Sequence, residues 1–155
     1  MIELKSRSRK ETEALGERLG RLLRRGDVVT LSGPMGAGKT VLVMGIARAL
    51  GCGENVSSPT FALAHEYPTE PPLVHMDAYR LENAEAFRAA GMEEYLAGDA
   101  VCLLEWPDVG IASLPASRLD ILIRGSGEET RTLYLRPMGE DWTARLENFN
   151  EDSGL

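Results

Sequence analysis

Apolar residues near the start of the chain recur at the spacing of one helix face. Ser8 and Glu11 form an S-x-x-E capping box, the usual sequence signature of a helix start. The leucines that follow at helical spacing are Leu15, Leu19, Leu22 and Leu23. The pattern predicts an amphipathic helix over residues 10–25, ended by Gly26.

Two almost continuous apolar runs follow, one on each side of a glycine-rich stretch. Residues 27–32 (DVVTLS) have the length and composition of a buried strand. Residues 40–50 (TVLVMGIARAL) form a longer apolar run that Gly51 ends, which is typical of a helix. The order is therefore strand, glycine loop, helix.

The rest of the chain continues to alternate between strand and helix patterns. Strands are predicted at 61–67, 73–77 and 100–105, with two short helices between the last two strands. Two further strands, RLDILIRG and TRTLYLR, are joined by a Gly-Ser-Gly-Glu turn and form a late hairpin. The alternation indicates an α/β fold with a mainly parallel sheet flanked by helices and a C-terminal β-hairpin. We expect one domain over 1–138, followed by an acidic C-terminal helix or tail over 139–155.

Composition narrows the possible classes of protein. At 155 residues the chain suits one domain, and no apolar run approaches the roughly 18 residues that span a membrane. The first residues have no secretory signal pattern, so we expect a cytoplasmic protein. The two cysteines lack zinc-site spacing and are expected to be buried thiols. The net charge of −7 argues against direct binding to RNA or DNA.

The stretch GPMGAGKT (33–40) carries the strongest chemical signal. It matches G-x-x-x-x-G-K-[ST], the P-loop or Walker A motif, and stands between the predicted strand and helix as that motif requires. In this motif backbone amides converge on phosphate oxygens, the lysine reaches the terminal phosphates and the hydroxyl binds Mg²⁺. The residues predicted to bind a nucleotide, ATP in our interpretation, are Gly33, Met35, Gly36, Ala37, Gly38, Lys39 and Thr40. The chain is therefore predicted to be a P-loop NTPase-type domain.

Two acids that end apolar strands are the candidates to complete this site. Asp77 ends LVHMD and Glu105 ends VCLLE. Because parallel strands end at the same edge of a sheet, both carboxylates should face the phosphates. Mg²⁺ needs few protein ligands beside the phosphates. We favour Glu105 for the metal shell, and Asp77 stays a close alternative.

The stretch SSPTF (57–61) allows two interpretations. It could simply begin the strand that follows. Thr60 could instead reach Mg²⁺ or the terminal phosphate, as switch-loop threonines do. The spacing leaves both open.

Four motifs together, GPMGAGKT, SSPTF, HMDAYRL and LLEWP, carry a family resemblance. In this order and spacing the chain resembles the TsaE (YjeE) family of P-loop ATPases, which take part in bacterial tRNA threonylcarbamoyladenosine (t6A) biosynthesis. The resemblance implies slow, Mg²⁺-dependent ATP hydrolysis in support of the partner proteins TsaD and TsaB. The resemblance also implies that the transfer chemistry belongs to TsaD. We therefore expect contact with tRNA only through the complex, and no contact with DNA or a membrane.

The resemblance also implies roles for single residues. It gives Lys39, Thr60, Asp77 and Glu105 catalytic roles, with Thr60 in a switch-like element and Asp77 as a Walker B-like acid. The implied Mg²⁺ ligands are Thr40 and Glu105, with Asp77 as the second candidate acid.

Some residues of the motifs have less definite roles in the resemblance. Trp106 follows Glu105 as the family pattern requires, and Tyr79 and Arg80 complete D-x-Y-R. Loose matches place the base near residues 8–12 and 127–131. His65 and His75 are interpreted as structural, since phosphoryl transfer needs no imidazole.

A small nucleotide or metabolite kinase would share the phosphate loop. Such an enzyme needs an acceptor pocket and usually a lid that carries arginines. The segment that would form this lid, residues 78–99, contains only two arginines, Arg80 and Arg88, which disfavours a kinase. A GTPase is disfavoured because the chain has no N-K-x-D motif, and a non-hydrolysing ATP-binding scaffold is disfavoured because both acids are present.

Overall fold

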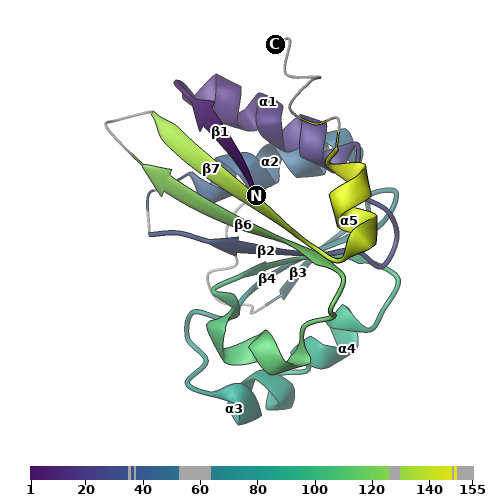
Figure 1. Cartoon of the computed structure of the whole chain (residues 1–155). Coiled ribbons are helices and arrows are strands. Elements are labelled where there is room, and N and C mark those ends of the chain that lie inside the picture. The colour runs from purple at the N-terminus through teal and green to yellow at the C-terminus, as the bar shows by residue number, and fades with distance from the viewer. Residues whose placement is uncertain (35, 37, 53–63, 126–129, 148, 150–155) are drawn as a thin grey trace.

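In the part of the chain that it describes, the computed structural model has seven strands in one sheet with helices on both faces (Figure 1). It describes residues 1–34, 36, 38–52, 64–125, 130–147 and 149. In chain order the elements are β1 (Ile2–Ser6), α1 (Arg9–Gly20), β2 (Val28–Ser32), α2 (Lys39–Ala49), β3 (Ala64–Tyr67), β4 (Leu73–Asp77), α3 (Ala84–Ala89), α4 (Met92–Leu96), β5 (Val101–Glu105), the 3-10 helix η1 (Pro107–Ser113), β6 (Arg118–Gly125), β7 (Arg131–Met138) and α5 (Glu140–Arg145).

The strand order is β1-β7-β6-β2-β5-β4-β3. The four central strands β6, β2, β5 and β4 run parallel to one another, whereas β3, β7 and β1 add antiparallel edges. The predicted α/β class, the parallel centre and the late hairpin β6–β7 are confirmed. Strand β1 is not anticipated by the sequence pattern, because its few apolar residues become a strand only through pairing with β7 at the other end of the chain.

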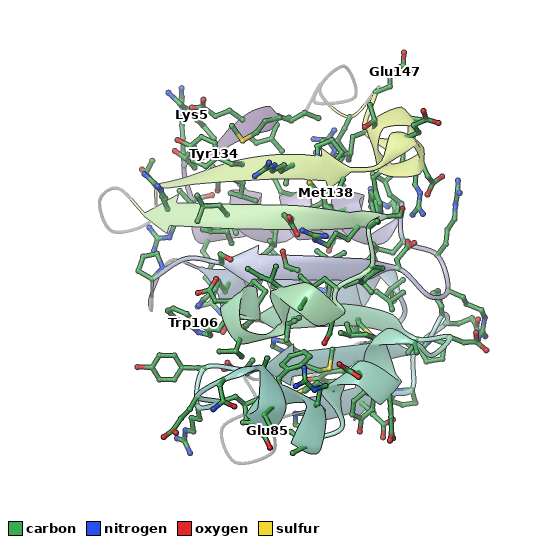
Figure 2. All side chains as sticks on the ribbon, turned by 60° about the horizontal axis from the view of Figure 1, so that its bottom comes forward. Lys5, Glu85, Trp106, Tyr134, Met138 and Glu147 are labelled. Atoms are coloured by element: carbon green, nitrogen blue, oxygen red, sulfur yellow. The ribbon has the colours of Figure 1, made fainter. Side chains whose placement is uncertain are left out.

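Two apolar clusters hold the layers together, one on each face of the sheet. The larger packs α1, α2 and the C-terminal residues Trp142, Leu146 and Phe149 against the strands. The smaller packs α3, α4 and η1 against β4, β5 and the start of β2, around Phe87 and Met92. Figure 2 views this second face, on which the helices cover one half of the sheet and the strand β7 that carries Tyr134 lies outside them.

The N-terminus of helix α1 is capped as predicted, because Ser8 Oγ accepts a hydrogen bond from Glu11 N at 3.0 Å. The helix ends at Gly20, earlier than the predicted residue 25, although Leu23 is still buried in the core. Two glycines allow α1 to approach α2 closely. A Cβ on Gly16 would lie 2.3 Å from Leu42 O, and one on Gly45 would lie 2.1 Å from Glu13 O. Helix α2 is thereby held tightly against α1.

Candidate functional site

The glycine loop (residues 33–40) connects the end of β2 to the start of α2. Gly36 and Gly38 have φ angles of 80° and 97°, in the left-handed region that favours glycine. Gly38 is the N-cap of α2 and supplies no side chain to bond the first backbone amides of the helix. Helix α2 begins at Lys39, one residue earlier than predicted. Met35 and Ala37 lie outside the described residues.

Lys39 is folded back over its own loop and is 7% exposed. Its Nζ donates a hydrogen bond to Gly33 O at 2.8 Å and lies 3.7 Å from Glu105 Oε1. The ammonium also lies 4.2 Å from the centroid of the Trp106 ring. A buried ammonium is costly unless it is paired, so these three groups fix its position.

Asp77 and Glu105 end adjacent parallel strands and are partners in the β4–β5 register. Both lie on the face of the sheet that α2 covers, because they continue the alternation of the core residues Leu73 and Leu103. The predicted meeting of the two acids at the edge of the sheet is therefore seen. Thr60 lies outside the described part of the chain.

The two acids differ in their surroundings. Glu105 is 3% exposed, while Asp77 is half-buried and accepts a hydrogen bond from Tyr79 N at 2.9 Å. Burial raises the pKa of Asp77 above its ordinary value. The Tyr79 amide opposes this rise, and the negative charge of Glu105 adds to it.

His75 is the residue whose place in the site was not foreseen from the sequence. It is fully buried in β4, two positions before Asp77 and on the same face, and its Nε2 lies 2.5 Å from Glu105 Oε2. The sequence signal is present, since a strand places residues two apart on one face and the predicted strand 73–77 ends in Asp77.

Trp106 and Tyr79 line the solvent side of these groups. Trp106 has φ 56°, an uncommon conformation for a large residue, and it directs the ring over Lys39. Its ring centroid lies 5.0 Å from that of Tyr79, which is 59% exposed. Figure 2 places Trp106 at the edge of the sheet where the parallel strands end. Arg80, the last residue of D-x-Y-R, is exposed.

Arg131 reaches the glycine loop from β7. Its Nη2 donates a hydrogen bond to Gly36 O at 3.1 Å, and its Nε lies 3.4 Å from where a Cβ on Gly38 would stand. The start of β7 is therefore brought against the loop. In the amino-terminal segment expected near the base, Ser8 and Glu11 form the cap of α1.

The arrangement resembles a site for a phosphate group with an associated divalent cation. Within the described ranges no group of three or more His, Cys, Asp or Glu side chains could hold a metal alone. A cation held mainly by phosphate oxygens needs only one or two carboxylates, and Asp77 and Glu105 provide these beside the half-buried Thr40. The residues present therefore fit Mg²⁺ bound together with a nucleotide.

Comparison with known proteins decides the family. The model of the family described as "Threonylcarbamoyl adenosine biosynthesis protein TsaE" matches residues 6–133. This chain belongs to the TsaE family. A TsaE from Bacillus subtilis is 36% identical over 146 residues, which cover 94% of this chain and 91% of the relative. A TsaE from Treponema pallidum is 40% identical over 128 residues, which cover 83% of this chain and 95% of the relative.

The fold of this TsaE-family chain is similar to a solved structure. The crystal structure of YdiB from Bacillus subtilis superposes with a TM-score of 0.84 at 31% identity, covering 99% of this chain and 96% of that one. The family resemblance and the predicted fold class are thus confirmed. Among the helices that the structure describes, none is long and apolar enough to cross a membrane.

Proposed function

We propose that this chain binds ATP with Mg²⁺ and hydrolyses it slowly, as an accessory protein in the synthesis of t6A in tRNA. The observation that carries the proposal is the convergence of Lys39, Asp77 and Glu105 at the glycine-capped start of α2. The names of the relatives, which describe tRNA threonylcarbamoyladenosine biosynthesis proteins, supply the pathway.

The glycine loop would bind the phosphates through its backbone amides. The first amides of α2 point along the helix axis and receive no side-chain cap, so an anion there is favoured by hydrogen bonds and by the helix dipole. Lys39 would exchange its bond to the Gly33 carbonyl for one to a terminal phosphate oxygen, a charge-assisted and therefore stronger bond.

The two acids would have different roles, one as a metal ligand and one in orienting water. Thr40 and Glu105 would hold Mg²⁺, which supplies neutralisation of the charge that develops on the phosphates. Asp77 would orient the attacking water, because it is the less buried of the two carboxylates and its raised pKa favours accepting a proton.

The position of residues 84–96 supports hydrolysis over kinase chemistry. This part of segment 78–99, where a kinase would carry its lid, forms α3 and α4 and packs through Phe87 and Met92 on the face of the sheet opposite to α2. Its Arg88 side chain is exposed there. These two helices are therefore not placed to close over the glycine loop.

The chemistry of t6A transfer would belong to partner proteins. The chain is acidic, with net charge −7, which disfavours tRNA binding by this chain alone. We propose TsaD and TsaB as the partners, as the family resemblance implies. They would sense the nucleotide state of this chain through a difference in affinity for its two states.

The test is a product analysis with the purified chain, Mg²⁺ and ATP. Slow release of inorganic phosphate, with no phosphorylated small molecule when nucleosides and common metabolites are added, is the expected result. Formation of a phosphorylated metabolite in stoichiometric amount would show that the chain is a kinase. Undetectable binding of ATP would contradict the proposal.

A further inference from the structure

His75 is buried against the functional acid and has a hydrogen-bond partner on only one side of its ring. Its side chain is fully removed from solvent, and Nε2 lies 2.5 Å from Glu105 Oε2. The opposite nitrogen, Nδ1, is buried and has no hydrogen-bond partner among the residues that the structure describes.

This asymmetry determines where the proton of the imidazole lies. A carboxylate only accepts hydrogen bonds, so the shared proton must come from Nε2. A proton on Nδ1 in its place would leave a buried N–H without an acceptor among the described residues, which is more costly than an unused lone pair. The geometry therefore places a proton on Nε2, which donates to Glu105.

The bond from His75 also sets the orientation of the Glu105 carboxylate. Oε2 is turned toward the ring, so Oε1 is the oxygen that faces Lys39 Nζ, at 3.7 Å, beside the glycine loop. Among the residues that the structure describes, Asp77 receives no such support from a buried side chain, and its Oδ1 accepts a hydrogen bond from the Tyr79 amide at 2.9 Å. One acid of the pair is thus held rigidly and the other less so.

We propose that His75 is a positioning residue, which donates from Nε2 to Glu105 Oε2 and so presents Oε1 to the phosphate and metal site. The inference rests on the proposed ATPase function, because that function gives the orientation of Glu105 its purpose. It adds a role for a residue that would otherwise count as core packing, and it specifies which oxygen of Glu105 is left for the ligand.

The position explains why a histidine stands among the apolar residues that precede Asp77 in β4. Its register partner on β5 is Leu103, and Leu73 precedes it on the same face. A leucine there would fill similar space but would leave Glu105 with Lys39 as its only ionic partner in the described part of the chain. A buried carboxylate with fewer donors is less well fixed and less well compensated.

The first arm of the test reads the tautomer by NMR in the nucleotide-free protein. The chain has two histidines, so ¹⁵N-labelled imidazoles give two sets of signals, and exposed His65 serves as the internal reference. The Nε2 of His75 should carry a slowly exchanging proton. An Nε2 without a proton, with the proton on Nδ1 alone, would overturn the inference.

The second arm compares His75→Gln with His75→Leu. Glutamine can place an amide donor near the position of Nε2, whereas leucine cannot donate. Leucine should lower kcat by about 10- to 100-fold with ATP affinity little changed, and glutamine should recover most of the loss. His65→Gln is the matched control and should behave like the wild type. If His75→Leu does not fold, His75→Asn, whose amide is too short to reach Glu105, replaces it.

Equal loss of kcat in the glutamine and leucine variants, or no loss in either, would overturn the positioning role. The NMR arm does not need ATP turnover. A wild-type protein that fails to hydrolyse ATP yet shows the Nε2 proton would therefore reject the proposed function while keeping the contact, so the two failures are distinguishable.

Discussion

Lys39 Nζ lies 3.7 Å from Glu105 Oε1, and both side chains are almost fully buried. The contact joins the start of α2 to the end of β5, the two elements expected to supply phosphate and metal ligands. Without a ligand, each group partly compensates the charge of the other. A bound phosphate would take over as the partner of Lys39, and a cation as the partner of Glu105.

Replacing Lys39 by alanine should therefore weaken ATP binding strongly. A charge-assisted hydrogen bond is worth roughly 1.5–3 kcal/mol, so the Kd should rise by about 10- to 150-fold. Calorimetric titration with ATP and Mg²⁺ measures this change. Lys5→Ala, which removes an exposed lysine, is the control and should leave the Kd as it is. Unchanged affinity in Lys39→Ala would contradict the assignment of the loop.

The substitution Asp77→Asn should raise the stability of the fold while it lowers ATP turnover. The substitution removes one of two facing carboxylates while keeping an oxygen that can accept from Tyr79 N, so the Tm should rise. If Asp77 is the base proposed for the attacking water, turnover should fall by about 100-fold or more while ATP still binds. Glu66→Gln, at an exposed carboxylate of the edge strand β3, should change neither quantity. A variant that is less stable and fully active would refute this interpretation.

The parts of the site that sequence patterns predicted are those with local signals. Each of these parts is recognised within a short continuous stretch: the glycine loop, the helix after it, and each of the two strands that end in an acid. The parallel centre of the sheet brings them together. The meeting of Asp77 and Glu105 followed from one topological rule, that parallel strands end at one edge.

The parts that sequence patterns missed depend on contacts between distant segments. Strand β1 exists through pairing with β7, and the approach of Arg131 to Gly36 depends on the same edge of the sheet. The bond between His75 and Glu105 needs the β4–β5 register, which a single sequence does not specify. The acidic character of the last residues likewise does not indicate the burial of Trp142 in the larger apolar cluster.

The two cysteines should differ sharply in reactivity. Burial raises the pKa of the Cys102 thiol to about 12, so almost no thiolate is present at mildly alkaline pH. Cys52 is half-buried and should react alone with a disulfide reagent in the folded protein. Unfolding in denaturant should release the second thiol, and Cys52→Ser should abolish the first reaction. Two thiols reacting equally fast in the folded protein would contradict the burial of Cys102.

Arg145 should contribute strongly to stability. Its Nη1 and Nη2 donate to the two oxygens of Asp27 at 2.6 and 2.8 Å, and both side chains are 9% exposed. Arg145→Ala leaves Asp27 buried without its cation, which should lower the free energy of unfolding by roughly 3–5 kcal/mol in urea denaturation.

The exposed Arg24 provides the matched control for Arg145. Its guanidinium lies 3.7 Å from Asp141, and Arg24→Ala should cost less than about 1 kcal/mol. Asp27→Asn in the Arg145→Ala background should recover part of the loss, because it removes the unpaired charge. A loss in Arg145→Ala no larger than that in Arg24→Ala would show that the buried pair does not hold α5 in place.

The central claim is that ATP hydrolysis by this chain serves repeated rounds of t6A synthesis by partner proteins. The most direct measurement is multiple-turnover modification of tRNA with purified TsaD and TsaB, threonylcarbamoyl donor and ATP, with and without this chain. We predict repeated rounds with the wild type, and arrest after a single round when the chain is omitted or carries Glu105→Ala. Sustained modification without the chain, or with Glu105→Ala at the wild-type rate, would contradict the account.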